Sequence, residues 1–206
     1  FNEDEITDYC PNSYFFTSVF AIWGWASWRR VFEKRDEQYA FLDDAYTMRE
    51  LKSFAKSRKL RSDLIRMMQD HRASGKQYFE SLFWSAMLLS SGMAIMPARN
   101  LINNLGLSDE STHFSGSMKT TPKAYRRIFM MKRHELEFPL KHPRYVLEDV
   151  EYKERLYKIN CWGHPWIKIG RSLEELFLNL RYGNFSIILK AIRKRFGKWM
   201  GTERHV

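Results

Sequence analysis

Three tryptophans, Trp23, Trp25 and Trp28, stand within six residues of one another around a glycine, and Arg29 and Arg30 follow directly. Indole faces stack on the C–H faces of sugar rings, and guanidinium groups donate hydrogen bonds to hydroxyl or phosphate oxygens. The cluster therefore predicts a saccharide-binding wall with an anion-binding edge. The alternative is that the indoles belong to the hydrophobic core and the arginines form a solvated face.

Several other kinds of chemistry lack a sequence signal. The chain has no Gly-rich phosphate loop, no Gly-x-Ser-x-Gly elbow and no His-Glu-x-x-His helix, which leaves NTPase, serine hydrolase and zinc protease functions unsupported. Its aromatic residues are not interleaved with basic ones in an RNA-binding motif, so nucleic acid is not an expected partner.

Composition predicts a folded protein with an excess of positive charge. The 206 residues are 44% hydrophobic and 16% aromatic, enough for a real core, and 10 Gly, 6 Pro and 2 Cys exclude collagen-like and disulfide-scaffold classes. A net charge of +10 favours polyanionic neighbours. Cys10 and Cys161 lie far apart, as in proteins whose thiols stay reduced, so a cytoplasmic location is expected.

Hydrophobic spacing predicts a mixed α/β fold in which helices dominate. Residues 13–32 favour a strand, a turn through Gly24 and then a helix. The remaining predicted elements are two short helices over 43–71, a buried helix over Tyr78–Ser90 stopped by Gly92, a strand over Met93–Met96 ended by Pro97, a polar loop over 107–122 and a helix over 147–157.

The C-terminal segment, Leu173–Met200, is predicted to be amphipathic and helical. Residues 181–206 carry seven Lys and Arg against one Glu, which is six of the ten excess charges. A helix of this kind favours an anionic membrane surface, on which it lies without crossing. The alternative is a helix that packs on its own domain or on a partner.

The tryptophan cluster belongs to a longer resemblance. The run SYFFTSVFAIWGWASWRRVFEKRD resembles the Tyr-Tyr-Phe-Ser and Trp-Gly-Trp-Ala-Thr-Trp-Arg-Arg pattern of bacterial family-two-like GT-A glycosyltransferases that build cell-surface polysaccharides. Gly92, Pro97, Asn-Leu-Ile-Asn-Asn-Leu-Gly at 100–106 and Ser-Thr-His at 111–113 follow in the order and spacing of that family. The resemblance covers residues 13 to 115.

The resemblance implies the second, acceptor-binding half of a GT-A nucleotide-diphospho-sugar transferase fold. In that family an acidic metal-binding motif follows an apolar strand in the first half, and this sequence resembles one that begins after it. The adjacent pair Asp43 and Asp44 lies downstream of the tryptophans, and we predict that it begins a helix. Asn100 is predicted to form a polar turn with Asn103 and Asn104.

The resemblance also implies site residues. Phe79-Glu80-Ser81-Leu82 stands where the family has Trp-Asp-Tyr-Gln, so Glu80 matches the position of a catalytic base. His113 matches a histidine that contacts the divalent metal, Mn²⁺ or Mg²⁺, or the donor diphosphate. Trp23, Gly24 and Trp25, with Trp28, Arg29 and Arg30, would form the acceptor or diphosphate surface. The alternatives are an exposed helix residue for Glu80 and a surface loop for His113.

Together these features predict residues 1–145 as the acceptor-side part of the transferase domain and 146–206 as a basic helical extension. The expected reaction transfers a sugar, with inversion, from a nucleotide sugar to a polysaccharide or lipid-linked acceptor, at the inner face of the membrane. The metal would be held mainly by the missing N-terminal half, so the isolated chain is expected to be inactive. The rival function is a non-catalytic basic module that binds a membrane surface or a polyanion.

Overall fold

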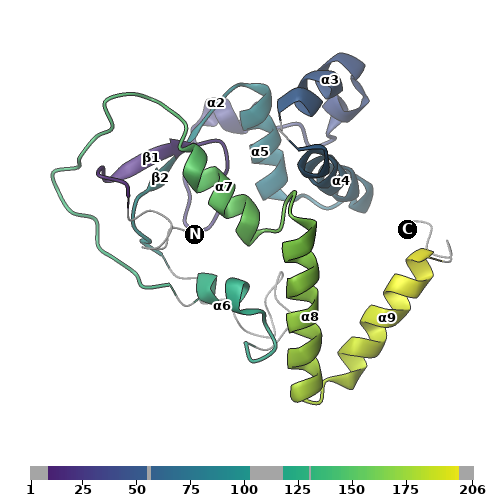
Figure 1. Ribbon diagram of the computed structural model, residues 1–206. Helices are drawn as coiled ribbons and strands as arrows, with labels where there is room; N and C mark the ends of the chain where they lie inside the picture. Colours follow the sequence, from purple (N-terminus) through teal and green to yellow (C-terminus); the bar gives the residue numbers. More distant parts are fainter. Residues whose placement is uncertain (1–8, 55–56, 103–117, 130, 200–206) are drawn as a thin grey trace. The chain divides into compact units, whose positions relative to one another are not determined.

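The computed structural model describes residues 9–54, 57–102, 118–129 and 131–199 (Figure 1). Within these ranges the protein is helix-rich, with eight α-helices, one 3-10 helix and one two-stranded sheet, and it fits a mixed α/β class. The elements in chain order are β1 (Tyr14–Thr17), α2 (Arg29–Phe32), η1 (Ala40–Asp43), α3 (Ala45–Phe54), α4 (Arg58–Ser74), α5 (Phe79–Leu89), β2 (Ala94–Pro97), α6 (Lys123–Phe129), α7 (Val150–Ile159), α8 (Pro165–Arg181) and α9 (Phe185–Trp199).

The chain forms two compact units. Unit 1 comprises Phe1–Asn103 and Met130–His164, and unit 2 comprises Asn104–Phe129 and Pro165–Val206. The boundary expected between residues 145 and 146 lies inside unit 1, because α7 contacts β1 and belongs with it. No helix in the described part of the chain has the length and apolar character needed to cross a membrane.

The sheet of unit 1 joins two segments that are far apart in sequence. β1 and β2 are antiparallel, with Phe15 opposite Met96 and Phe16 opposite Ile95. On its other side β1 meets the residues before α7, since the Asp149 amide donates to the Phe16 carbonyl at 2.7 Å. The two predicted strands are therefore confirmed, and together they place α7 next to the residues that lead into the tryptophan cluster.

Local signals in the sequence account for the ends of the helices. The Ser57 hydroxyl accepts the Leu60 amide at 2.9 Å to cap α4, and Gly75 ends that helix in the left-handed conformation. Asp44 caps α3 by accepting the Thr47 amide at 2.8 Å, which confirms the predicted helix start, and these hydrogen bonds lower the pKa of its carboxyl. α5 ends just before Gly92, as predicted: the left-handed residue of this helix end is Ser91, and the Gly92 amide donates to the Met87 carbonyl at 2.8 Å.

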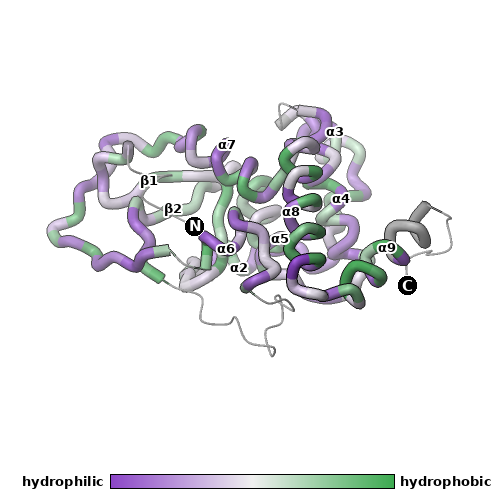
Figure 2. The backbone as a smooth tube through the Cα atoms, turned by 60° about the horizontal axis from the view of Figure 1, so that its bottom comes forward, coloured by the Kyte–Doolittle hydropathy of each residue, from purple (hydrophilic) through white to green (hydrophobic). Residues whose placement is uncertain are grey.

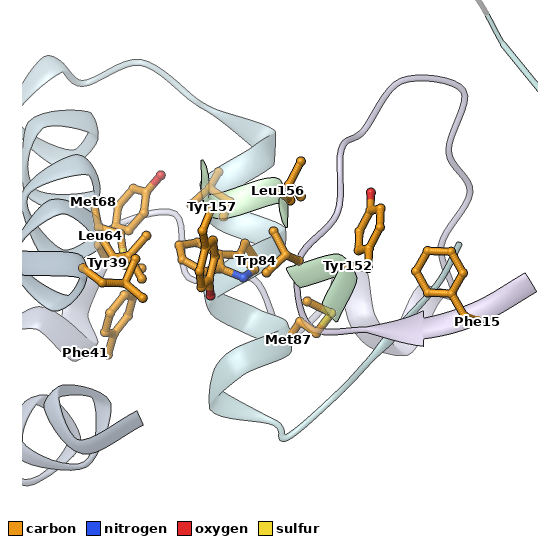
Figure 3. Packing of buried hydrophobic residues seen from close by; sticks show 13 residues of the cluster. Phe15, Tyr39, Phe41, Leu64, Met68, Trp84, Met87, Tyr152, Leu156 and Tyr157 are labelled. Carbon is orange, nitrogen blue, oxygen red and sulfur yellow. The ribbon is translucent and has the colours of Figure 1, made fainter. Parts of the chain in front are cut away.

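The hydrophobic core of unit 1 is continuous from α4 to the sheet (Figure 3). Leu64 and Met68 of α4 pack with Tyr39 at one end of this cluster, and Phe15 of β1 lies at the other end against Tyr152 of α7, with ring centroids 4.7 Å apart. Trp84 of α5 occupies the middle and stacks on Trp162. α5 is thus the central helix of the unit, and its position depends on the residues that pack at both ends of the core cluster, those near α4 and those near β1 and α7.

Unit 2 contains α6, α8 and α9. The amphipathic segment expected over Leu173–Met200 is two helices: α8 begins at Pro165, a favourable first helical residue, and a turn at Gly183 separates it from α9. The amide of Lys123 at the start of α6 donates to Glu174 of α8 at 2.8 Å, and the Arg171 guanidinium lies 4.4 Å from the Tyr125 ring centroid. These contacts fix one side of α8 to α6.

A buried polar cluster joins α4 to α5. The Ser81 hydroxyl is 2.5 Å from the Tyr39 hydroxyl and 2.7 Å from Nδ1 of His71, whose ring stacks on Tyr78. Burial lowers the pKa of His71, although the nearby Glu80 and Asp70 carboxylates oppose that shift. The unfolded chain therefore binds a proton at this imidazole more readily than the folded chain does.

We predict that this cluster makes stability depend on pH. The folded-state pKa of His71 lies below its ordinary value of 6.5. The contribution of the buried neutral imidazole to the free energy of unfolding is therefore complete above about pH 6.5, and it is lost as pH falls below that value, because the unfolded chain then binds the proton more readily. Urea unfolding followed by tryptophan fluorescence at pH 7.5 and 5.5 measures the loss. His71→Gln should reduce the difference between the two pH values, and an unchanged difference in this variant would rule out His71 as its source.

Candidate functional site

The candidate site is a pocket of about 700 Å³ in unit 1. Its wall is built from residues 20–34, from the α5 side chains Phe83, Ala86 and Met87, and from residues 92–102, which include β2. The predicted tryptophan cluster and the predicted 97–102 segment are therefore brought together, although more than sixty residues separate them in the sequence. A pocket of this size is within the usual range for small-molecule sites, roughly 300 to 1,000 Å³.

The segment Phe20–Trp28, here called the tryptophan loop, is held at its start by Ser18. The Ser18 amide donates to the Glu148 carboxylate at 3.0 Å, and the Ser18 hydroxyl contacts the same oxygen. The Ser18 carbonyl accepts the indole N–H of Trp84 at 2.7 Å. One residue thus ties the beginning of the tryptophan loop to α5 and to the segment before α7.

Glu148 stays charged in this setting. Burial raises the pKa of its carboxyl, but hydrogen bonds from Lys153 and Ser18 act in the opposite direction and together outweigh burial, so the pKa is lowered. The Lys153 ammonium is 2.5 Å from the carboxylate. A charged acceptor strengthens both Ser18 contacts, so the loop begins from a rigid point.

Gly24 shapes the tryptophan loop. Its φ of +56° lies in the left-handed region, which a side chain rarely adopts. A Cβ at this position would meet two side-chain atoms of Ile102 at 3.1 Å. Glycine therefore lets the loop turn and also lets it approach the 100–102 segment closely.

The tryptophans are pocket residues and not core residues. Trp28 is 56% exposed and Trp25 is 39% exposed, while Trp23 is half-buried, and all three line the pocket. Trp25 packs edge-on against Phe83 of α5, with ring centroids 4.7 Å apart. The three indoles therefore lie at the pocket surface and not in the core, and Phe83 of α5 holds Trp25 from behind.

Three cations line the pocket together with the indoles. Arg30 lies over the Trp28 ring at 4.9 Å from its centroid, and Lys34 is in the turn that follows α2. Arg99 contributes from the other wall. Arg29, although exposed, is not a lining residue, and no Asp or Glu is found among the lining residues of the described chain. The pocket is thus suited to a ligand that combines sugar-like surfaces with negative charge.

Asn100 confirms the predicted polar turn at the second wall. Its side-chain amide donates to the Ile102 carbonyl at 2.8 Å and to the Lys132 carbonyl at 3.2 Å, and it is 4% exposed. Its carbonyl accepts the His134 amide at 2.7 Å. Asn103 and Asn104 lie outside the described residues. Asn100 therefore lines the pocket and, through its side-chain amide, ties the wall to the segment at Lys132.

Glu80 lies on the same helix as the pocket wall but does not line the pocket. It is half-buried in the first turn of α5, close enough to His71 and Tyr39 to influence both electrostatically. Its neighbour Phe79 contacts Phe83, which does line the pocket, with centroids 6.4 Å apart. Glu80 is therefore in the first turn of α5, whereas the residues of this helix that line the pocket, Phe83, Ala86 and Met87, lie further along it.

His113 and any metal ligands around it cannot be placed, since residues 103–117 lie outside the described chain. Among the described residues no group of three or more His, Cys, Asp or Glu side chains is arranged to hold a metal ion.

Sequence reasoning missed Lys34, Arg99, Phe83 and the Ser18–Glu148 link. Lys34 could have been found because it lies four residues after Arg30, and residues so spaced share a helix face. Arg99 follows the strand-ending Pro97 just before the 100–106 motif. The Ser18–Glu148 link has no local signal, since its two residues are 130 positions apart.

Comparison of the chain with family models, with curated proteins and with solved structures finds no match.

The geometry at Gly24 leads to a prediction with a matched control. Gly24→Ala and Gly75→Ala both place a side chain in the left-handed region, at a cost of about 1 kcal/mol each. A Cβ at Gly75 meets nothing within 4 Å, whereas one at Gly24 crowds Ile102, so Gly24→Ala should lose about 1 kcal/mol more. Urea unfolding compares the two variants, and equal losses would show that the Gly24–Ile102 approach is not tight.

Proposed function

We propose that this chain is the acceptor-side half of an inverting GT-A glycosyltransferase, which transfers a sugar from a nucleotide sugar to a polysaccharide or lipid-linked acceptor. One observation carries the proposal: the tryptophan loop and the 97–102 segment, which resemble two separate motifs of one glycosyltransferase family, line a single pocket. Motifs that matched by chance would not be expected to meet at one cavity.

The indoles would bind the acceptor sugar. Trp25 and Trp28 present ring surface to solvent, and Phe83 holds Trp25 in place from behind. Stacking on a pre-positioned ring costs little conformational entropy on binding, so affinity comes from the apolar faces of the sugar. The hydroxyl groups of the acceptor then remain available for hydrogen bonds and for reaction.

The cations of the pocket would bind phosphate. Arg30, Lys34 and Arg99 face the same cavity, and a phosphate group satisfies several such donors at once. This phosphate belongs either to the donor nucleotide or to a lipid-linked acceptor. The Arg30 guanidinium lies 4.9 Å from the Trp28 ring centroid, so a phosphate bound by Arg30 would be next to a ring on which a sugar could stack.

In the proposed reaction an acceptor hydroxyl oxygen attacks the anomeric carbon of the donor sugar. The bond from that carbon to the diphosphate oxygen breaks, and the nucleoside diphosphate leaves with the bonding electron pair. Glu80 is the proposed base that takes the hydroxyl proton, because it matches the position of the catalytic base in the family that the sequence resembles, although it does not line the pocket of this half.

A divalent metal, Mn²⁺ or Mg²⁺, is part of the proposal as a counter-charge for the leaving diphosphate. Its carboxylate ligands are assigned to the nucleotide-binding half, outside this chain, with His113 as the contact from this half. The described residues of this chain supply no group of three or more His, Cys, Asp or Glu side chains for such an ion.

Transfer assays on the full-length gene product test the proposal. A panel of nucleotide sugars and a water-soluble saccharide acceptor are used without vesicles. Glu80→Gln should lower kcat by roughly 100-fold or more, since it removes the base, while donor binding persists. Trp28→Ala should raise the KM for the acceptor roughly tenfold, because a stacking contact of about 1.5 kcal/mol is lost.

Matched control variants distinguish the loss of a site residue from a general loss of folding. Trp166→Ala changes another exposed tryptophan that lies in unit 2, and Glu33→Gln neutralises an exposed carboxylate next to α2. Neither variant should alter transfer. Turnover that survives Glu80→Gln would remove this residue from the mechanism, and the absence of transfer from every donor would reject the glycosyltransferase proposal.

A further inference from the structure

The two long helices of unit 2 carry an apolar face that is open to solvent. On α8 this face follows the spacing i, i+3, i+7 and i+11 on the exposed residues Trp166, Ile169, Leu173 and Phe177. Trp166 is 81% exposed and Leu173 is 61% exposed. Such a series of large apolar residues normally faces a partner.

The opposite side of α8 is already occupied within unit 2. Glu174 accepts the amide of Lys123, and Arg171 lies over the Tyr125 ring, so α6 covers this side. The exposed series is therefore the face of α8 that its own unit leaves open. The residues that contact α6 and those that face solvent alternate along the helix, as expected for a helix with two distinct sides.

The connection from α8 to α9 is well ordered by hydrogen bonds. The Asn179 side chain is buried, donates to the Glu175 carbonyl at 2.9 Å and lies 3.3 Å from the side-chain amide of Asn184. The Asn184 amide donates to the Asn179 carbonyl at 2.9 Å. Gly183 provides the left-handed residue that the turn needs. α9 thus begins from a fixed turn and is not a loosely attached tail.

α9 has an apolar side, and all of its charged residues are basic. Phe185, Ile188, Leu189 and Ile192 follow the spacing i, i+3, i+4 and i+7, and of these Phe185 and Leu189 are 60% and 55% exposed. The segment 185–199 contains five Lys and Arg and no Asp or Glu. Figure 2 shows hydrophobic and hydrophilic residues following one another in the coloured first part of α9.

We propose that α9 docks on the surface of an anionic phospholipid bilayer, with the exposed apolar series of α8 extending the contact. The apolar residues enter the boundary between headgroups and acyl chains, and Lys190 and Arg193 remain at the anionic headgroups. Charge decides among the occupants: a second copy would bring the same five positive charges to α9, whereas an anionic lipid surface neutralises them. This inference stands independently of the proposed function.

Vesicle co-sedimentation of the whole chain tests the proposal. Vesicles of phosphatidylcholine alone are compared with vesicles that also contain phosphatidylglycerol, at low and high salt. The chain should bind the anionic vesicles and be released by salt, because exposed charges are screened. Lys190→Gln combined with Arg193→Gln should weaken binding roughly 25-fold, about fivefold for each charge removed.

Two further double variants test whether the location of the charge matters and whether the apolar side of α9 is needed for binding. Lys52→Gln with Lys76→Gln removes the same charge from exposed positions of unit 1 and should leave binding unchanged. Leu189→Gln with Ile192→Gln replaces two exposed apolar residues by a good helix former, so binding should be lost while circular dichroism is retained.

Three results would overturn the proposal. Equal binding to neutral and anionic vesicles would show that charge does not select the surface. Equal weakening by the α9 and unit 1 charge variants would show that binding follows net charge alone. A dimer in sedimentation velocity that the Leu189 and Ile192 variant dissociates, with no vesicle binding, would identify a second copy as the occupant.

Discussion

The hydrogen bond from the Trp84 indole to the Ser18 carbonyl is the contact on which the candidate site depends. Trp84 lies in the middle of the core, so its position is fixed from both sides by packing. Because Ser18 is hydrogen-bonded to Trp84, the start of the tryptophan loop is fixed relative to the core. Glu148, in the segment before α7, holds Ser18 through a second hydrogen bond. An exposed aromatic loop thereby gains a rigid base, which a binding surface needs if ordering costs are to stay small.

Much of unit 1 could be predicted because its signals are local. The strand at Tyr14–Thr17, the helix over Phe79–Leu89 and the capping role of Asp44 follow from periodicity and side-chain chemistry within a few residues. The left-handed Ser91 was missed because glycine at the next position is the commoner helix stop. The break at Gly183 was missed because the apolar spacing continues on both sides of it.

The site itself was predictable only in part. Tryptophans and arginines in a short run indicate a surface for sugar and phosphate, but which of them face one cavity depends on contacts between distant segments. Arg30 lines the pocket and Arg29 does not, because neighbouring residues on a helix point about 100° apart. Arg99 and Phe83 enter the site through the β1–β2 pairing and the packing of α5, which no local pattern encodes.

In both units aromatic or apolar surface stands next to positive charge, which suits ligands that are themselves amphipathic and anionic.

Indole N–H signals in two-dimensional ¹H–¹⁵N NMR test the central claim, that the tryptophan loop and the 97–102 segment form one saccharide pocket. An acceptor oligosaccharide is titrated into the labelled chain, and the seven indole signals are assigned by single Trp→Phe variants. If the tryptophan loop binds the saccharide, the shifts are confined to Trp23, Trp25 and Trp28, and the signals of Trp84, Trp162 and Trp166 do not change. Shifts of Trp166 without shifts in the tryptophan loop, or no shifts with any saccharide, would contradict it.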